Sequence, residues 1–337
     1  MLAFPPMTNF HNHSLLLNGH IILQDKASAL AGSVLQPPAS PSTVVLDACA
    51  APGQKTSQLA QSMQNMGTLY ALDRDSSRVA ILKTLCKRHN LKNVTILHQN
   101  FLDVDVFKHP YNQVEYILLD PSCSCSGIVN RLDLAIDSLS TELTPYSEIE
   151  ISCADILNTP RSRLENLQQF QLSLLQKAFS FPKVNHIVYS TCSIHDEENE
   201  QVVEKSLKFT TEFDVCTPLP NLQSSIRGKS EYRYGEQCIR TVPKRDHTIG
   251  FFIAYFKRKS IISNQDNENQ LEPSTTTSEI EKTQSNFFSG LRSSSDIDKI
   301  DCRPAQKKLK NEKDAEGTCP QSPSKPFDQV AKESAIL

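Results

Sequence analysis

Residues 43–73 decide the fold, and they read TVVLDACAAPGQKTSQLAQSMQNMGTLYALD. Residues 43–47 and 68–73 are short runs that are apolar almost throughout, and each ends in an aspartate. Such runs are typical of strands that are buried on both faces, as in a parallel sheet. A loop of small residues with Gly53 separates the first run from a helical stretch. The segment therefore predicts a strand–loop–helix–strand unit.

The same alternation continues along the chain to residue 256. Further strand-like runs are residues 94–100, 114–120, 185–191 and 248–256. Residues 76–89 and 163–179 place apolar side chains on one helical face, and Asp196 is expected to cap another helix. Strands that alternate with helices predict an open α/β sheet with right-handed crossovers.

Composition divides the 337 residues into three parts. We expect an amino-terminal extension over residues 1–42, a catalytic domain over residues 43–257 and a disordered tail over residues 258–337. From residue 260 the chain is rich in polar residues and carries the whole net charge of −3. Such a segment buries too little apolar surface to offset the entropy of ordering.

The composition of the chain restricts the cellular locations and the partners that we expect for it. Hydrophobic residues make up 38% of the chain, but no apolar run reaches eighteen residues, so we expect no membrane partner. No signal peptide is recognisable, and the ten cysteines contain no CxxC pair, so they are interpreted as intracellular thiols. A net charge of −3 excludes a strongly basic protein but not an RNA-binding one.

Polar or reactive residues follow four of the predicted strands. They are Asp47, Asp73, the Asp120–Cys123 segment and Cys192. Ligands of open α/β sheets bind at the carboxyl ends of the strands, so this arrangement indicates a functional site. The first loop is neither a Walker motif nor GxGxxG, while Asp73 suits the hydroxyls of a ribose. S-adenosylmethionine therefore fits the pattern better than NAD or ATP.

Two cysteines at these strand ends favour covalent catalysis. Either Cys123, which follows Asp-Pro-Ser, or Cys192 could be a nucleophile, and the residues alone leave the choice open. Asp120 lies beside both in the predicted sheet. A zinc site at Cys123 and Cys125 is disfavoured because no companion pair of ligands accompanies them.

The chain resembles the NOL/NOP/Sun-domain RNA cytosine-5 methyltransferases, most of all the branch called member five. The matching strings are GHIILQDKAS, LDACAAPGQKTSQLA, ILLDPSCSCSG, VYSTCSIHDEENEQVV and GFFIA, within residues 3–257. This resemblance implies a Rossmann-like fold with a seven-stranded, mostly parallel sheet. It also implies S-adenosylmethionine as cofactor and methylation of carbon 5 of cytosine in RNA.

The resemblance assigns roles to individual positions. Cys192 corresponds to the nucleophile, Cys123 to the cysteine that aids product release, and Asp120 lies between cofactor and base. The positions that correspond to cofactor-binding residues are Cys49, Ala50, Ala51, Pro52, Gly53, Gln54, Lys55, Asp73, Arg78, Asp103 and Asp120.

The member-five branch implies large-subunit ribosomal RNA as substrate and a location in the nucleus, specifically in the nucleolus. Transfer RNA is the alternative substrate, and a non-catalytic RNA-binding factor of ribosome assembly is the alternative function. Arg240 is among the basic residues that we expect to be candidates for RNA contacts.

Two features depart from the family pattern. Cys125 stands where the family usually has glycine, and it adds a third thiol beside the catalytic loop. About forty residues precede the first predicted strand, where family members carry a longer RNA-binding region, so we expect that region to be missing.

Overall fold

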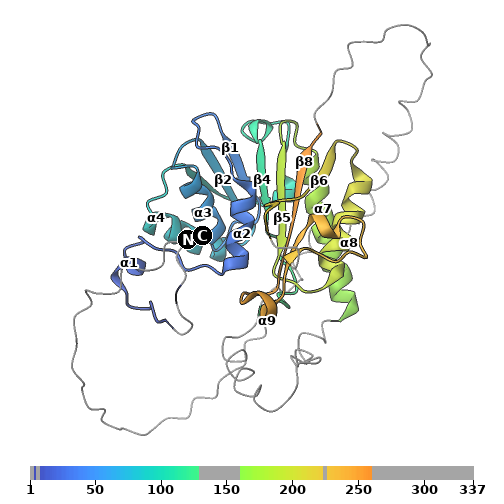
Figure 1. The fold of residues 1–337 in the computed structure, drawn as a ribbon. Coiled ribbons are helices and arrows are strands. Elements are labelled where there is room, and N and C mark those ends of the chain that lie inside the picture. The colour runs from blue at the N-terminus through green and yellow to red at the C-terminus, as the bar shows by residue number, and fades with distance from the viewer. Residues whose placement is uncertain (1–3, 5–7, 129–159, 223–225, 260–337) are drawn as a thin grey trace, which may run out of the picture. The chain divides into compact units, whose positions relative to one another are not determined.

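A mixed sheet of eight strands runs through the part of the chain that the structure, a computed structural model, describes (Figure 1). The described residues are 4, 8–128, 160–222 and 226–259. The expected tail, residues 258–337, lies outside them from residue 260 onward. No helix among the described residues has the length and apolar character needed to cross a membrane.

The strands are β1 (Val44–Asp47), β2 (Thr68–Asp73), β3 (Val94–His98), β4 (Tyr116–Leu119), β5 (His186–Thr191), β6 (Phe213–Cys216), β7 (Ile239–Thr241) and β8 (Phe251–Arg258). The α-helices are α1 (Ser14–Leu17), α2 (Lys26–Leu35), α3 (Gln54–Ser62), α4 (Ser76–Arg88), α7 (Arg161–Phe179), α8 (Glu200–Ser206) and α9 (Pro243–Asp246). Short 3₁₀ turns include Phe101–Asp103 and Asp196–Glu198.

Strand order in the sheet is β3-β2-β1-β4-β5-β8-β6, with β7 beside β8. The first five strands are parallel, while β8 runs antiparallel to β5, β6 and β7. The expected mostly parallel α/β sheet is thus confirmed, but it has eight strands rather than seven. The reason is the length of β8, which pairs with β7 through Phe251–Ile253 and with β6 through Tyr255–Arg258.

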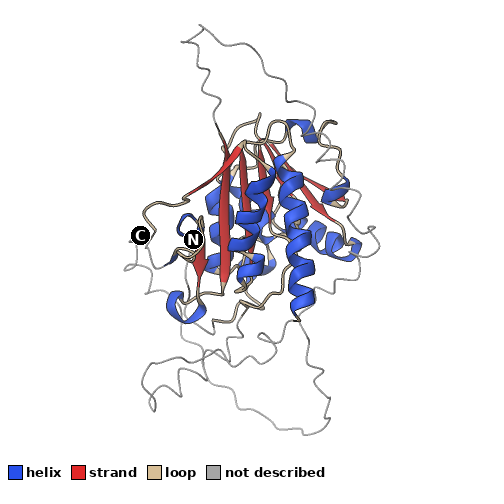
Figure 2. Cartoon of the chain, turned by 90° about the vertical axis from the view of Figure 1, so that its right-hand side faces the viewer, coloured by secondary structure: helices blue, strands red, loops and turns tan. Residues whose placement is uncertain are grey.

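Helices cover both faces of the sheet, with α2, α3 and α4 on one side and α7 and α8 on the other (Figures 1 and 2). Neighbouring strand residues therefore enter different cores. Leu118 packs with the α2 and α3 cluster, whereas Ile117 and Leu119 pack with the α7 cluster. Burial on both faces explains why these strands are apolar at nearly every position.

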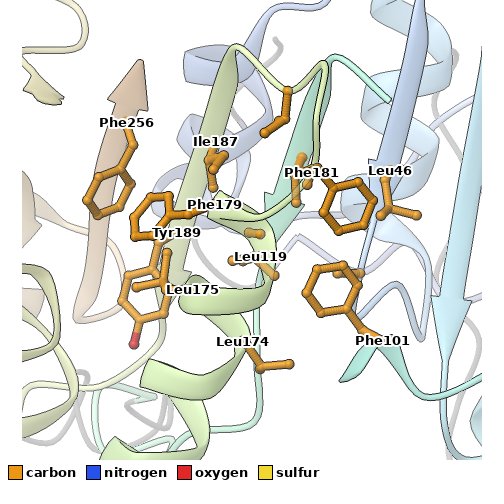
Figure 3. Packing of buried hydrophobic residues seen from close by; sticks show 14 of the residues in the cluster. Leu46, Phe101, Leu119, Leu174, Leu175, Phe179, Phe181, Ile187, Tyr189 and Phe256 are labelled. Atoms are coloured by element: carbon orange, nitrogen blue, oxygen red, sulfur yellow. The ribbon is translucent and has the colours of Figure 1, made fainter. Parts of the chain in front are cut away.

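The larger core lies under α7 and is rich in aromatic side chains. Figure 3 shows Phe179 and Tyr189 meeting between α7 and the strands, with Phe101 close to Phe181. The Phe101 and Phe181 rings stack with centroids 5.7 Å apart. This packing fixes α7 against β4 and β5, the two strands whose ends carry the candidate cysteines.

One predicted helix start is wrong. Asp196 does not cap a helix with its side chain, because its carboxylate pairs with Lys229 and Arg240 instead. The helix α8 starts at Glu200, after a 3₁₀ turn over Asp196–Glu198.

Candidate active site

The carboxyl ends of four neighbouring strands bring the candidate residues together. Strand β1 lies between β2 and β4, and β5 lies beside β4. The order of the strands reverses direction at β1, where open α/β sheets bind their ligands. Asp47 and Asp73 are the last residues of β1 and β2, whereas Asp120 and Cys192 directly follow β4 and β5.

The loop after β1 is held in place by the strands on either side. The Ala48 N–H donates to the Leu118 carbonyl at 3.0 Å, and the Ala50 N–H donates to the Leu72 carbonyl at 2.8 Å. Gly53 has a φ of 115°, and a Cβ there would lie 2.7 Å from Leu82 Cδ1. The backbone therefore requires glycine where the loop passes into α3.

Asp73 links the end of β2 to this loop. Its Oδ2 accepts a hydrogen bond from the Ala51 N–H at 3.2 Å, and its Oδ1 accepts one from the Asp75 N–H at 3.0 Å. Arg78 Nη2 lies 3.6 Å from Asp73 Oδ2 and also donates to the Ala51 carbonyl. A carboxylate has about four acceptor positions, so Asp73 retains capacity for further donors.

Asp47 is buried and lacks a full set of partners. Thr56 Oγ1 donates to its Oδ2 at 2.7 Å, while its Oδ1 has no partner in the structure. Burial, opposed by the Thr56 hydrogen bond, raises the pKa of Asp47 to about 7. Its carboxyl group is therefore partly protonated near neutral pH.

Asp120 lies between Lys55, which follows the loop after β1, and the candidate cysteines. Lys55 Nζ lies 2.8 Å from its Oδ2, and Ser190 Oγ donates to its Oδ1 at 2.6 Å. Burial lowers the pKa of Lys55, but the Asp120 charge and hydrogen bond outweigh this and raise it overall. Lys55 is therefore a cation that balances the negative charge of the Asp120 carboxylate.

Three thiols meet beyond Asp120. The Sγ atoms of Cys123 and Cys192 are 3.3 Å apart. The Sγ atom of Cys125 joins them, so that all three lie within 4.8 Å of one another. Cys125 has a φ of 58°, which turns the chain so that its thiol contacts the Cys123 carbonyl at 3.7 Å.

Cys125 has the lowest pKa of the three thiols in this cluster. Hydrogen bonds from Cys123 and Cys192 lower the pKa of Cys125, and the charges of Arg163 and Arg78 act in the same direction. The hydrogen bond from Cys123 lowers the pKa of Cys192, but its contact with Cys125, burial and Asp120 raise it overall. Cys192 is therefore protonated near neutral pH.

Buried polar side chains from α7 and the turn after β5 support the loop that carries Cys123. Glu198 Oε1 accepts from the Ser124 N–H at 2.9 Å and from Gln171 Nε2 at 3.0 Å. Gln171 Nε2 also donates to the Ser122 carbonyl at 3.2 Å. Sequence reasoning missed Glu198 and Gln171, because only the packing of α7 brings them under this loop.

Arg240 plays a structural part here, which corrects the expectation that it contacts RNA. It is buried, its Nε donates to Glu200 Oε1 at 2.8 Å, and its Nη1 donates to the Ile194 carbonyl at 2.9 Å. Its Nη2 also pairs with Asp196 at 3.0 Å. The guanidinium therefore anchors the segment after Cys192, and with its side chain only 10% exposed it offers little surface to phosphate.

The structure places nearly all the predicted site residues in this one region. Those on or beside the first loop are Cys49, Ala50, Ala51, Pro52, Gly53, Gln54 and Lys55. Asp103 is further out, exposed at the end of the 3₁₀ turn after β3. Burial, together with nearby carboxylates, raises the pKa of Cys49, so its thiol stays protonated.

Comparison with known protein families identifies relatives of this chain. Residues 33–142 and 154–257 match the family described as 16S rRNA methyltransferase RsmB/F. A mouse protein named 28S rRNA (cytosine-C(5))-methyltransferase is 40% identical over 264 residues, which are 78% of this chain and 52% of the mouse protein. The human protein named putative methyltransferase NSUN5C is 35% identical over 262 residues, 77% of this chain and 75% of that protein.

Comparison with solved structures identifies methyltransferases with a similar fold. A Pyrococcus horikoshii protein described as a methyltransferase homolog is 27% identical, with a TM-score of 0.57 over 76% of this chain and 73% of its own. The chain spans about half the length of several curated relatives that it matches.

Proposed function

Because the chain belongs to the RsmB/F family of RNA methyltransferases, as its resemblance to the member-five branch predicted, we propose that it methylates carbon 5 of cytosine in RNA. The proposed methyl donor is S-adenosylmethionine, and the proposed substrate is large-subunit ribosomal RNA. The observation that carries the proposal is the contact between the thiols of Cys123 and Cys192 beside Asp120.

The loop after β1 fits a nucleoside cofactor. Asp73 has acceptor capacity for two ribose hydroxyls, and the small residues from Ala48 to Gly53 let a ligand approach the backbone closely. Arg78 is 42% exposed, whereas Asp73 is 3% exposed, so movement of the arginine would open the carboxylate to the ribose. Bound S-adenosylmethionine would supply an electrophilic methyl carbon.

Cys192 has the role of nucleophile in the proposed reaction. Carbon 5 of cytosine is too weak a nucleophile to take a methyl group directly. Addition of the Cys192 sulfur to carbon 6 forms a carbon–sulfur bond, opens the double bond between carbons 5 and 6 and makes carbon 5 nucleophilic. Carbon 5 would then take the methyl group of S-adenosylmethionine, whose bond to the sulfonium sulfur would break so that S-adenosylhomocysteine leaves. The thiol proton leaves before this addition, and Cys125 and Asp120 are the neighbouring groups that can share it.

Asp120 stabilises the charge that addition creates in the ring. Its carboxylate, paired with Lys55 and Ser190, can hold a proton against ring nitrogen 3 as the thiolate adds. Lys55 can replace that proton, since its ammonium lies 2.8 Å from the carboxylate.

Cys123 is assigned to product release. After methyl transfer, the proton on carbon 5 passes to solvent water, and its electron pair re-forms the double bond between carbons 5 and 6 as the bond between carbon 6 and Cys192 breaks. Cys123 lies 3.3 Å from the sulfur that departs, so it can donate a proton to that sulfur. The cytosine has to leave its stack to reach these thiols, which favours single-stranded or looped RNA.

The relatives motivate the substrate and location. A mouse relative is named as a 28S ribosomal RNA methyltransferase, and such RNA is made in the nucleolus, so we propose a nuclear, nucleolar site of action. Residues 43–257 would form the methyltransferase domain, with residues 1–42 as its extension.

The decisive experiment traps the covalent intermediate. Purified Cys123→Ala protein is incubated with S-adenosylmethionine and ribosomal RNA fragments and is resolved on a denaturing gel. We expect an RNA–protein adduct that is absent from the double variant Cys123→Ala/Cys192→Ala. Transfer RNA in a parallel reaction tests the alternative substrate.

Two outcomes would contradict the assignment. An adduct formed by Cys192→Ala protein but not by Cys123→Ala protein would exchange the two roles. Absence of any adduct, in protein that binds S-adenosylmethionine and associates with ribosomal RNA, would favour the non-catalytic assembly factor.

A further inference from the structure

Cys125 is neither the proposed nucleophile nor the cysteine assigned to product release, yet its thiol completes a three-sulfur cluster. We propose that Cys123, Cys125 and Cys192 form a binding site for a thiophilic d¹⁰ metal ion, Zn²⁺ above all. This site stands independently of the methylation reaction, because it depends only on where the three sulfur atoms lie.

The spacing of the sulfur atoms suits such an ion. All three Sγ atoms lie within 4.8 Å of one another, and the pair Cys123–Cys192 is at 3.3 Å. Zinc–sulfur bonds of about 2.3 Å in a tetrahedral site separate the sulfur atoms by roughly 3.8 Å. The observed spacing brackets this value, so small side-chain rotations suffice to form the site.

The chemical nature of the donors selects the class of ion. Three thiolates are soft ligands that favour zinc or copper(I) over magnesium or calcium, which prefer oxygen. The fourth position of a zinc ion would be open to water, as in sites with three protein ligands. Cys123 and Cys192, whose pKa values are raised, would release their protons on binding, so binding is expected to strengthen as the pH rises.

The backbone around Cys125 keeps its thiol in the cluster. With a φ of 58°, Cys125 has a left-handed conformation that is uncommon outside glycine and asparagine. The neighbouring chain is tied down, since the Gly127 N–H donates to the Cys192 carbonyl at 2.9 Å. The segment that carries Cys123 and Cys125 is thus bound directly to Cys192.

Metal binding and catalysis would exclude each other. A zinc ion on Cys192 would occupy the sulfur that attacks cytosine, so metal would inhibit methylation reversibly. Serine in place of Cys125 would remove one ligand, while Cys123 and Cys192 would both remain present.

The test measures zinc binding by the full, reduced chain in competition with a chromogenic chelator. We expect one zinc ion at the cluster. We also expect Cys125→Ser to weaken binding by at least about tenfold, since even an outer-shell partner of a metal site is worth about 10- to 100-fold. Cys216→Ser is the matched control, because Cys216 lies on β6 and not in the cluster, and it should bind zinc like the wild type.

Alkylation mapping by mass spectrometry on the wild-type chain tests the site without any variant. Zinc should protect Cys123, Cys125 and Cys192 together, and a chelator should restore their reactivity. Wild-type affinity in Cys125→Ser protein would overturn the proposal. Protection confined to other cysteines, or no zinc bound by the reduced chain, would overturn it equally.

Discussion

Cys125 alters the proton balance of the two cysteines beside it. In the cluster its sulfur accepts hydrogen bonds from both neighbours, which lowers its own pKa and raises that of Cys192. Cys125 therefore helps to keep the proposed nucleophile, Cys192, protonated. In the resembled family the position of Cys125 is usually glycine. The proton that Cys192 must lose has an acceptor within the cluster.

Removal of that thiol should release the proposed nucleophile. In Cys125→Ser protein, the hydrogen bond from Cys123 remains and lowers the pKa of Cys192, while the opposing contribution of Cys125 is gone. We expect alkylation of Cys192 by iodoacetamide to become faster at neutral pH and its pH profile to shift downward. Mass spectrometry gives this profile, with Cys216 in the same sample as an internal control. An unchanged profile would contradict the described proton balance.

Asp47 should make stability depend on pH. Unfolded, its carboxyl ionises near 3.8, whereas burial raises the pKa of Asp47 in the folded chain to about 7. Its stabilising contribution is therefore complete below about pH 4 and is lost as pH rises through 7. We expect the wild type to lose stability relative to Asp47→Asn by about 1.4 kcal/mol per pH unit within this window. Urea unfolding at several pH values measures the difference.

The control for Asp47 is an exposed aspartate. Asp105 is 48% exposed and pairs with a solvent-exposed lysine, so Asp105→Asn should change the free energy of unfolding by less than about 1 kcal/mol. A constant free-energy difference between wild type and Asp47→Asn from pH 4 to 7 would show that Asp47 ionises normally.

At the scale of elements, a buried ion pair joins β7 to α8 behind the Cys192 segment. Glu200 is 1% exposed, and its carboxylate accepts two hydrogen bonds from Arg240. In Arg240→Gln protein this carboxylate loses its cation while remaining buried, which costs about 3–5 kcal/mol of unfolding free energy. Chemical denaturation followed by circular dichroism measures the loss.

An exposed pair provides the comparison. Arg161 and Glu165 lie one turn apart on α7 with side chains 93% and 61% exposed, so Arg161→Gln should cost less than about 1 kcal/mol. The double variant Arg240→Met/Glu200→Leu should recover much of the stability, since no buried charge remains unpaired. Equal losses in Arg240→Gln and Arg161→Gln would contradict the view that burial makes the difference.

Sequence alone predicted the buried elements well and the edges poorly. The strand β2 was predicted at its observed bounds, and β1 within one residue, because continuous apolar runs mark strands covered on both faces. The strands β6 and β7 were missed, since Asp214 interrupts one and Arg240 the other, so neither forms a continuous apolar run. The helix α2 was also missed, because alanine, glycine and serine dominate its ten residues and leave a weak apolar pattern.

The site shows the same limit. The sequence predicted which strand ends carry reactive groups, because carboxyl ends of parallel strands share one edge of the sheet. It did not predict that Cys125 joins the other two thiols or that Glu198 supports their loop. Both features depend on side-chain directions that tertiary packing sets. The spacing of residues in the sequence does not indicate these directions.

At the scale of the whole described domain, one sheet is shared by two cores. Strand residues alternate between the α2 and α3 side and the α7 side, so neither core can form without the strands of the other. The domain should therefore unfold as one cooperative unit rather than face by face.

This expectation can be tested with one mild substitution in each core. Ile117 on β4 belongs to the α7 side and Ile253 on β8 to the α2 side, and both are fully buried. We expect each isoleucine-to-valine substitution to lower the free energy of unfolding by about 0.5–1.5 kcal/mol. The double variant should lose the sum within about 0.5 kcal/mol, because the two side chains belong to separate clusters on opposite faces of the sheet. The chain has no tryptophan, so tyrosine fluorescence and far-ultraviolet circular dichroism would follow urea unfolding. A single transition with an unchanged slope is expected in all three variants, because each substitution weakens the same folded unit. Two separated transitions, or a variant that moves one probe and not the other, would show that the cores unfold independently.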